Sequence, residues 1–218
     1  MKRIILWVLA LMLTMTFASA EEIRTQSCNW YEVFVRSYQD GDGDRIGDLK
    51  GLMSRLDYIA DMGYDGLWLM PIMPSPSYHK YDVKDYCAID PQYGTLDDFK
   101  ALVSACHERG IRIIVDLPVN HTSVSHPWFT QACTALRKKE TDNPYIDYYC
   151  FSEKGGQKMI PVPGTSWFYE EQFSGGGMPD LNLDSKAVRS EIRNILDFWL
   201  NECGADGFRL DAVTSYYA

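Results

Sequence analysis

The sequence predicts an α/β fold: a (β/α)8 TIM barrel, truncated after about four strands, with a small domain inserted after strand three. Two observations predict this. Apolar runs alternate with segments of helical periodicity, which is typical of parallel strands joined by helices. In addition, two of these runs, at residues 116–121 and 207–213, pass from apolar to polar and charged side chains at their carboxyl ends. Buried barrel strands have this pattern where they open into a site.

The predicted elements follow one another in regular order. Residues 30–38 are predicted as the first strand, and apolar residues recur at helical spacing over 49–60 until Gly63 ends the helix. The later elements are a strand at 66–70, a helix at 95–108, a strand at 111–115, a helix at 185–203 and a strand at 207–210. This alternation implies parallel strands with right-handed crossovers.

A doubly wound open sheet is the alternative arrangement of these elements. The barrel is favoured because no glycine-rich turn follows the first strand, and because about sixty aromatic-rich residues, expected to be irregular, separate the third strand from its helix. We therefore expect barrel residues at 21–118, an inserted domain at 119–183, and the third helix and fourth strand at 184–218. Eight such units need about 250 residues, so we expect the amino-terminal part of a longer enzyme.

The first twenty residues are typical of a secretory signal peptide. Lys2 and Arg3 precede an apolar stretch at 4–13, and Ala-Ser-Ala at 18–20 forms a cleavage site. The stretch is short for a membrane span, so we expect a secreted or periplasmic protein with no stable membrane anchor after cleavage. An uncleaved anchor is the alternative. Without Lys2 and Arg3, 19 basic residues face 30 acidic ones, a charge that disfavours nucleic acid as a partner.

The six cysteines belong to a chain expected to be exported, where disulfides persist. Cys87, Cys106 and Cys203 lie in predicted strand or helix and are expected to be packing thiols. Cys133 and Cys150 share one irregular segment, and a bridge between them would restrict a long loop. The sequence leaves open whether this pair is a disulfide or two free thiols.

The strand ends carry ionisable side chains where a barrel builds its active site. Asp211 ends the fourth predicted strand, and Arg209 lies two residues earlier on the same strand face, where its charge can keep the carboxylate ionised and oriented. A buried structural ion pair is the alternative. Asn120 and His121 follow the third strand, and Asp116, within it, is expected to support Arg209 rather than to react.

Taken together, the two strings resemble the first and second signature regions of the α-amylase family of glycoside hydrolases. Two further segments are similar to signatures of that family: residues 78–86, which contain Tyr81, and Met-Pro-Asp-Leu-Asn at 178–182. All four occur in family order, and the resemblance covers about residues 27–217. It implies a retaining mechanism, in which a carboxylate attacks the anomeric carbon while a second carboxyl group protonates the leaving oxygen.

The resemblance implies a role for each matched residue. Asp211 would be the nucleophile, and Arg209 its partner and a sugar contact. His121 would donate a hydrogen bond to the sugar in the cleaved-bond subsite, where Tyr81 would stack on the ring. His79 is expected to contact substrate as well. The acid/base glutamate and the third catalytic aspartate of the family would lie beyond residue 218.

The implied substrate is an α-glucan, namely starch, glycogen or maltodextrin, cleaved at internal α-1,4 bonds. Exo-acting members usually carry Asp-Asn-Gly before the stacking tyrosine, whereas this chain has Tyr78-His79-Lys80, which favours an endo-acting α-amylase. The alternatives are an exo-acting α-glucosidase, a maltodextrin-cleaving relative, or a non-catalytic carbohydrate-binding relative. The last often loses the nucleophile, and Asp211 argues against it.

Residues 40–48 form an acidic loop and a candidate Ca²⁺ site. Its carboxylates repel one another, and a hard cation relieves this most easily. By resemblance to a family loop, the Ile46 carbonyl would be a further ligand. The expected ligands are Asp40, Asp42, Asp44, Ile46 and Asp48. A solvated acidic turn is the alternative.

A second Ca²⁺ site is implied by resemblance alone. In the family, Asn120 and Asp180 would contribute ligands to it. Members that use this site usually have a histidine four residues after the nucleophile, where this chain has Ser215. The departure argues against this site.

Overall fold

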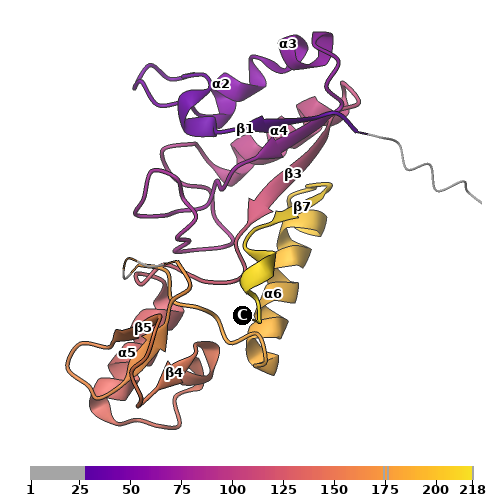
Figure 1. The fold of residues 1–218 in the computed structure, drawn as a ribbon. Helices are drawn as coiled ribbons and strands as arrows, with labels where there is room; N and C mark the ends of the chain where they lie inside the picture. Colours follow the sequence, from indigo (N-terminus) through magenta and orange to yellow (C-terminus); the bar gives the residue numbers. More distant parts are fainter. Residues whose placement is uncertain (1–27, 174, 176, 218) are drawn as a thin grey trace, which may run out of the picture.

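The computed structural model describes residues 28–173, 175 and 177–217, so the predicted signal peptide lies outside the described residues. The main sheet is parallel, in the order β1 (Trp30–Val33), β2 (Gly66–Leu69), β3 (Arg112–Leu117) and β7 (Gly207–Leu210) (Figure 1). Each strand thus pairs with the preceding strand of this sheet, with no reversal of order. A doubly wound sheet reverses at its centre, whereas this sequential order is that of a barrel wall.

The two faces of the sheet differ in character. Leu67 and Leu69 of β2 and Val115 of β3 are fully buried in the main hydrophobic core, which also contains Phe99 and Leu102 of α4 (Leu96–His107). The helices α2 (Leu49–Met53), α3 (Leu56–Asp61) and α6 (Lys186–Asp197) also line this core. Because side chains alternate along a strand, the opposite face carries Trp68, Asp116 and Arg209.

Polar side chains set the starts of these helices. Thr95 and Asp98 form a capping box on α4, with the Asp98 amide donating to Thr95 Oγ1 at 3.1 Å and the Thr95 amide donating to the Asp98 carboxylate at 2.9 Å. Asp48 caps α2 by accepting from the Gly51 amide at 2.8 Å. The last residue of the acidic loop is thereby fixed to the helix that follows.

A smaller unit lies between β3 and α6. It contains α5 (Pro127–Lys138), the 3-10 turn η2 (Pro144–Tyr148), and an antiparallel sheet of β4 (Phe151–Ser152), β6 (Phe168–Glu170) and β5 (Met159–Pro161). The unit has its own core, in which the Phe129 ring meets the Tyr149 and Tyr169 rings edge-on at 5.0 and 4.9 Å. Backbone bridges from His121 to Asp180 and from Tyr149 to Leu181 connect the segments that enter and leave it.

Three details differ from the sequence predictions. Residues 127–138, expected to be irregular, form α5, with Pro127 in its first turn and His126 as its cap. The first strand ends at Val33, because the chain turns into η1 (Val35–Ser37). The last predicted helix is divided, since α6 passes into one π turn, η3 (Phe198–Glu202), before Cys203.

Of the two states that the sequence leaves open for Cys133 and Cys150, the structure has the free thiols, as it does for all six cysteines. Cys133 packs in the core of the smaller unit, and Cys150 lies in an acidic pocket beside Asp180 and Glu170. Burial raises the pKa of both thiols to about 11. Cys106 and Cys203 are buried in the main core, as expected of packing thiols.

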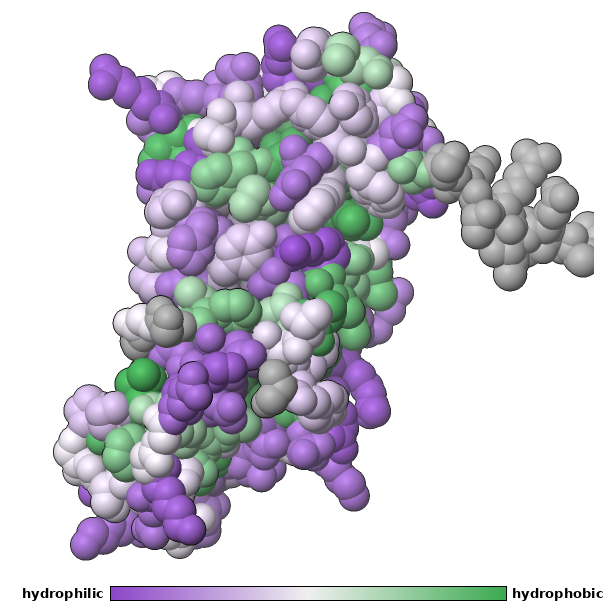
Figure 2. Space-filling model, viewed as in Figure 1, coloured by the Kyte–Doolittle hydropathy of each residue, from purple (hydrophilic) through white to green (hydrophobic). Residues whose placement is uncertain are grey.

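The β7 edge of the sheet is hydrophobic. Leu210 and Val213 are 46% and 54% exposed, and Figure 2 shows hydrophobic surface around the position of β7. An open strand edge bordered by apolar side chains is suited to pairing with a further strand. Among the described residues, no helix is long and apolar enough to cross a membrane.

Candidate active site

The site begins at the carboxyl end of β7. Asp211 follows this strand, and its amide donates to the Leu117 carbonyl of β3 at 3.3 Å. Arg209 Nη1 contacts three carboxylate oxygens, one of Asp211 and both of Asp116, the latter at 3.1 and 3.2 Å. One guanidinium group therefore orients two carboxylates that come from adjacent strands.

Asp116 is the buried centre of this arrangement. It is fully enclosed and also accepts hydrogen bonds from the Trp68 indole N–H at 3.2 Å and the Tyr81 hydroxyl at 3.1 Å. Burial raises its pKa to about 6, although Arg209 acts in the opposite direction. The Arg209 guanidinium also lies 5.2 Å from the centre of the Trp68 ring. Asp116 thus holds Arg209 and Tyr81 in place without reaching solvent.

The turn after β2 contributes Tyr81 and His79. The Tyr81 amide donates to His79 Nδ1 at 3.2 Å, which leaves Nε2 of the neutral histidine ring protonated. The centres of the two rings are 6.0 Å apart. Burial and the neighbouring Asp116 raise the pKa of the Tyr81 hydroxyl well above its ordinary value, so the phenol remains a donor.

His121 lies at the exit of β3. It is 1% exposed, and burial lowers its pKa, which favours the neutral ring. Its Nε2 lies 3.2 Å from the Tyr81 carbonyl, which can only accept a hydrogen bond, so Nε2 carries the proton. Nδ1 is enclosed and has no hydrogen-bond partner in the described part of the chain. In this arrangement neither nitrogen has a proton free for a ligand, and donation to a sugar stays a prediction.

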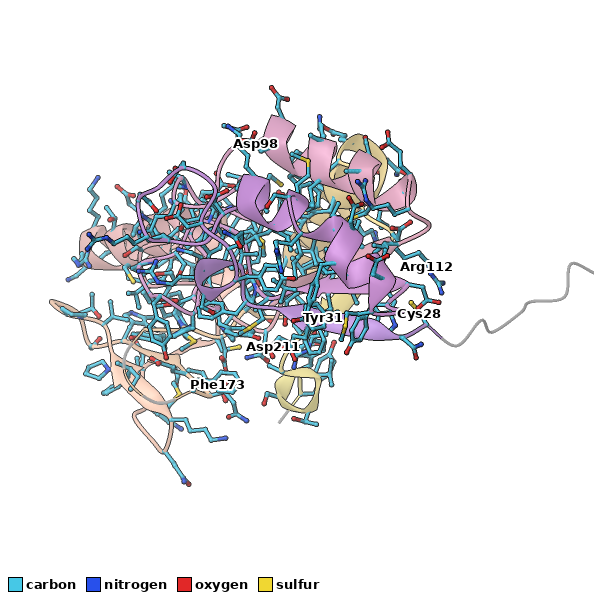
Figure 3. All side chains as sticks on the ribbon, turned by 90° about the horizontal axis from the view of Figure 1, so that it is seen from above. Cys28, Tyr31, Asp98, Arg112, Phe173 and Asp211 are labelled. Atoms are coloured by element: carbon cyan, nitrogen blue, oxygen red, sulfur yellow. The ribbon has the colours of Figure 1, made fainter. Side chains whose placement is uncertain are left out.

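These side chains line a pocket of about 250 Å³. Four predicted residues contribute to it, namely His79, Tyr81, His121 and Asp211, together with Phe173 and Met178, which the sequence analysis did not single out as site residues. Figure 3 places Asp211 and Phe173 near each other, on the side away from Cys28 and Arg112 at the amino ends of the strands. Phe173, 38% exposed, meets the His121 ring edge-on at 5.2 Å. Met178 belongs to a recognised motif, whereas no sequence pattern indicated Phe173.

The acidic loop folds around its own carboxylates. Asp40 accepts from the amides of Gly43 at 2.6 Å and Arg45 at 2.8 Å, and these hydrogen bonds lower the pKa of its carboxyl group. Asp40, Asp42 and Asp48 each offer an oxygen within 4.8 Å of the others. Asp44 is not in this group, and its carboxylate accepts from the Ile46 amide at 2.7 Å. Three carboxylates in mutual reach suit an oxygen-binding cation.

Asn120 and Asp180, the ligands expected for a second ion, are hydrogen-bonded to each other. The Asn120 amide donates to Asp180 Oδ1 at 3.0 Å, and burial raises the pKa of Asp180 to about 6. Both line a pocket of about 160 Å³ with Glu170 and Ser215. Ser215 Oγ accepts from Gln172 Nε2 at 3.3 Å. Among the described residues, three or more carboxylate, histidine or cysteine side chains lie close enough to share a metal ion in the acidic loop, but not around Asn120 and Asp180.

Comparison with known proteins identifies the family. Residues 32–218 match the family described as "Alpha amylase, catalytic domain". The chain is 45% identical over 221 residues to Alpha-amylase 3 of Dictyoglomus thermophilum, covering 99% of this chain and 42% of that protein. It is 39% identical over 197 residues to an oligo-1,6-glucosidase of Parageobacillus thermoglucosidasius, covering 84% of this chain and 34% of that protein.

A solved structure is similar throughout the fold. Eubacterium rectale Amy13B superposes with a TM-score of 0.84 at 55% identity, covering 86% of this chain and 37% of that one. The chain thus spans less than half the length of these relatives. The four parallel strands are the first part of a TIM barrel whose sheet stays open within the described residues.

Proposed function

Because the chain belongs to the α-amylase catalytic-domain family of glycosidases, we propose that it is part of a retaining hydrolase that cleaves internal α-1,4 bonds of starch, glycogen or maltodextrins. One observation carries this proposal. Asp211 lies in a pocket with Tyr81 and is hydrogen-bonded to Arg209, so an oriented carboxyl group and an aromatic ring line one sugar-sized space. That arrangement suits a nucleophile and a stacking platform better than a structural ion pair.

In the proposed mechanism, Asp211 attacks the anomeric carbon of the sugar held in this pocket. A covalent glycosyl ester forms with inversion as the leaving oxygen departs, and water then hydrolyses the ester with a second inversion, so the configuration is retained. Arg209 holds the Asp211 carboxylate in position, and Asp116 keeps Arg209 in place. Tyr81, Phe173 and Met178 exclude water from the apolar face of the ring. A carboxylic acid from the rest of the enzyme protonates the leaving oxygen.

The endo-acting assignment depends on the turn before Tyr81. Tyr78, 67% exposed, extends from this turn toward solvent and offers a second aromatic surface beside the pocket. An open, aromatic rim suits a long chain that continues beyond the cleaved bond. An exo-acting glucosidase fits the family equally well, as the oligo-1,6-glucosidase relative illustrates. The substrate range is therefore the first quantity to measure.

We also propose Ca²⁺ as a structural ion of the acidic loop. Asp40, Asp42 and Asp48 would hold it, with Asp44 and the Ile46 carbonyl as additional ligands. For a second ion, Asn120 Oδ1 and Asp180 would be the ligands, and the hydrogen bond between the two residues is made by Asn120 Nδ2. The proposed location is secreted or periplasmic, with an α-glucan as the partner, no nucleic-acid partner and no stable membrane anchor after cleavage of the signal peptide.

The decisive experiment uses the full-length enzyme. Soluble starch, maltoheptaose, isomaltose and trehalose are offered separately, and the products are followed by chromatography and by NMR of the anomeric proton. The expected result is release of mixed maltooligosaccharides in the α configuration. Stepwise release of glucose alone, or cleavage of isomaltose in preference to starch, would overturn the endo-acting assignment. Products in the β configuration would overturn the retaining mechanism.

A further inference from the structure

Lys80 is a buried lysine between two residues of the candidate pocket. Its side chain is 2% exposed, and its neighbours His79 and Tyr81 both line the pocket. Because the Lys80 side chain is buried while its two neighbours line the pocket, Lys80 points into the protein at the place where His79 and Tyr81 point toward the ligand.

The ammonium group of Lys80 has a complete set of partners. Nζ lies 2.7 Å from Asp90 Oδ2 and 3.3 Å from Gln92 Oε1, and it sits 4.9 Å from the centre of the Tyr93 ring. Asp90 is itself buried, and its other oxygen accepts from the Gln92 amide at 2.9 Å. The residue is thus tied to the segment that leads into α4, across the turn from the pocket.

The backbone of Lys80 indicates that the residue type matters here. Its φ is +63°, in the left-handed region that side chains other than glycine, asparagine and aspartate rarely adopt. Glycine would fit this backbone with less strain. A lysine in this position carries both that strain and a buried charge, and Asp90 is the charged partner without which the ammonium group would be buried alone.

We propose that Lys80 is a positioning residue, which acts through Tyr81 and His79 by anchoring their turn to Asp90. The proposal rests on the proposed function for its activity readout, since the turn serves the sugar-binding pocket. Tyr81 is also held by its hydroxyl on Asp116 and by its carbonyl on His121 Nε2. Loss of the anchor would leave these two contacts in place but would remove the ion pair that ties the turn to Asp90.

The test compares Lys80→Gly with Lys139→Gly in the full-length enzyme. Lys139 has nearly the same backbone, with φ +61°, but is exposed at the end of α5 and has no part in the pocket. Both variants relieve the same backbone strain, and only the first removes the anchor. We expect Lys80→Gly to lower kcat by about 10- to 100-fold with a smaller change in KM, since misplacing a positioning group costs about this much. Amide hydrogen exchange over residues 76–82 should become faster. Lys139→Gly should change neither quantity.

Lys80→Met combined with Asp90→Asn is the second variant, because it removes both charges without leaving one buried alone. It should reproduce the loss of kcat even if Lys80→Gly fails to fold. Unchanged exchange over residues 76–82, or faster exchange with unchanged kcat, would overturn the proposal. If the wild-type enzyme cleaves no α-glucan, the proposed function fails, and hydrogen exchange alone decides whether Lys80 anchors the turn.

Discussion

Asp116 and Arg209 are register partners on the adjacent parallel strands β3 and β7, and the guanidinium Nη1 lies 3.1 Å from Asp116 Oδ1. The backbone pairing therefore brings this ion pair together, before any loop contributes. The same guanidinium also contacts Asp211, two residues after Arg209 and just beyond the end of β7. The sheet thus fixes the geometry of the proposed nucleophile, and Asp116 is its buried support.

The first prediction concerns pH and stability. The pKa of Asp116 is about 6 in the folded protein, against 3.8 ordinarily, so the native state binds this proton more tightly than the unfolded state does. Its contribution to the free energy of unfolding is complete below about pH 4 and is lost as pH rises through about 6. Asp116→Asn should make stability fall less steeply over this range, by at most about 1.4 kcal/mol per pH unit. Urea unfolding at pH 4, 5, 6 and 7 measures this slope.

Asp98→Asn is the control for this measurement, because the pKa of Asp98 is shifted in the opposite direction to that of Asp116. The Thr95 hydroxyl lowers the pKa of Asp98, so its contribution is present above its ordinary pKa and lost as pH falls. That variant should leave the slope between pH 5 and 7 unchanged. Equal slopes for wild type and Asp116→Asn would mean that Asp116 is not the buried, titrating group described here.

The second prediction concerns the nucleophile in the full-length enzyme. Asp211→Asn keeps the shape of the side chain but cannot form the glycosyl ester, so kcat should fall by roughly three or more powers of ten. Binding of maltoheptaose should change little, since Tyr81 and His121 remain. Steady-state kinetics and calorimetric binding on the same preparation separate the two quantities.

Asp206→Asn is the matched control, at the other end of β7. Asp206 accepts from the Ile113 amide at 2.7 Å and contacts His107, so this variant should lose stability and keep kcat. If Asp211→Asn retained a tenth of the wild-type kcat, Asp211 would not be the nucleophile.

The strand ends could be predicted from the sequence because their geometry is local. In a parallel sheet the carboxyl ends share one edge, so Tyr81, His121 and Asp211 had to lie on the same side of the molecule once their strands were found. The expected support of Arg209 by Asp116 is confirmed by their ion pair.

The smaller unit could not be predicted as well, because its structure depends on tertiary packing. The helix α5 has clear end signals, with Pro127 at its start and basic residues Arg137 and Lys138 at its end, but the aromatic-rich flanks obscured them. Phe173 lies in the pocket because the chain that follows β6 returns to the segment after β3, where its ring meets His121. Cys133 and Cys150 lie in one segment but in different environments, and sequence proximity alone could not decide between a bridge and the two free thiols that the structure has.

The third prediction concerns Phe173. Its ring covers the pocket and meets His121, so Phe173→Ala should weaken maltoheptaose binding by about tenfold, the equivalent of about 1.4 kcal/mol of aromatic contact. Stability should change little, since the side chain is 38% exposed. Tyr58→Ala on α3, also exposed, is the control and should bind as wild type does. Equal affinities for all three proteins would remove Phe173 from the site.

The last prediction concerns the acidic loop. Asp42→Ala with Asp44→Ala should abolish one Ca²⁺-binding event in calorimetric titration of the full-length enzyme, because these carboxylates are proposed ligands. Ca²⁺ should bind more tightly than Mg²⁺, since the loop offers a flexible set of oxygens rather than a strict octahedron. Asp97→Ala, which removes an exposed carboxylate in the first turn of α4, should keep that event. Asp180→Asn distinguishes the two proposed sites, because it should remove only a binding event beside Asn120 and leave that of the acidic loop. Unchanged titration curves for the double variant would leave the loop as a solvated turn, stabilised by the hydrogen bonds from its own amides to Asp40.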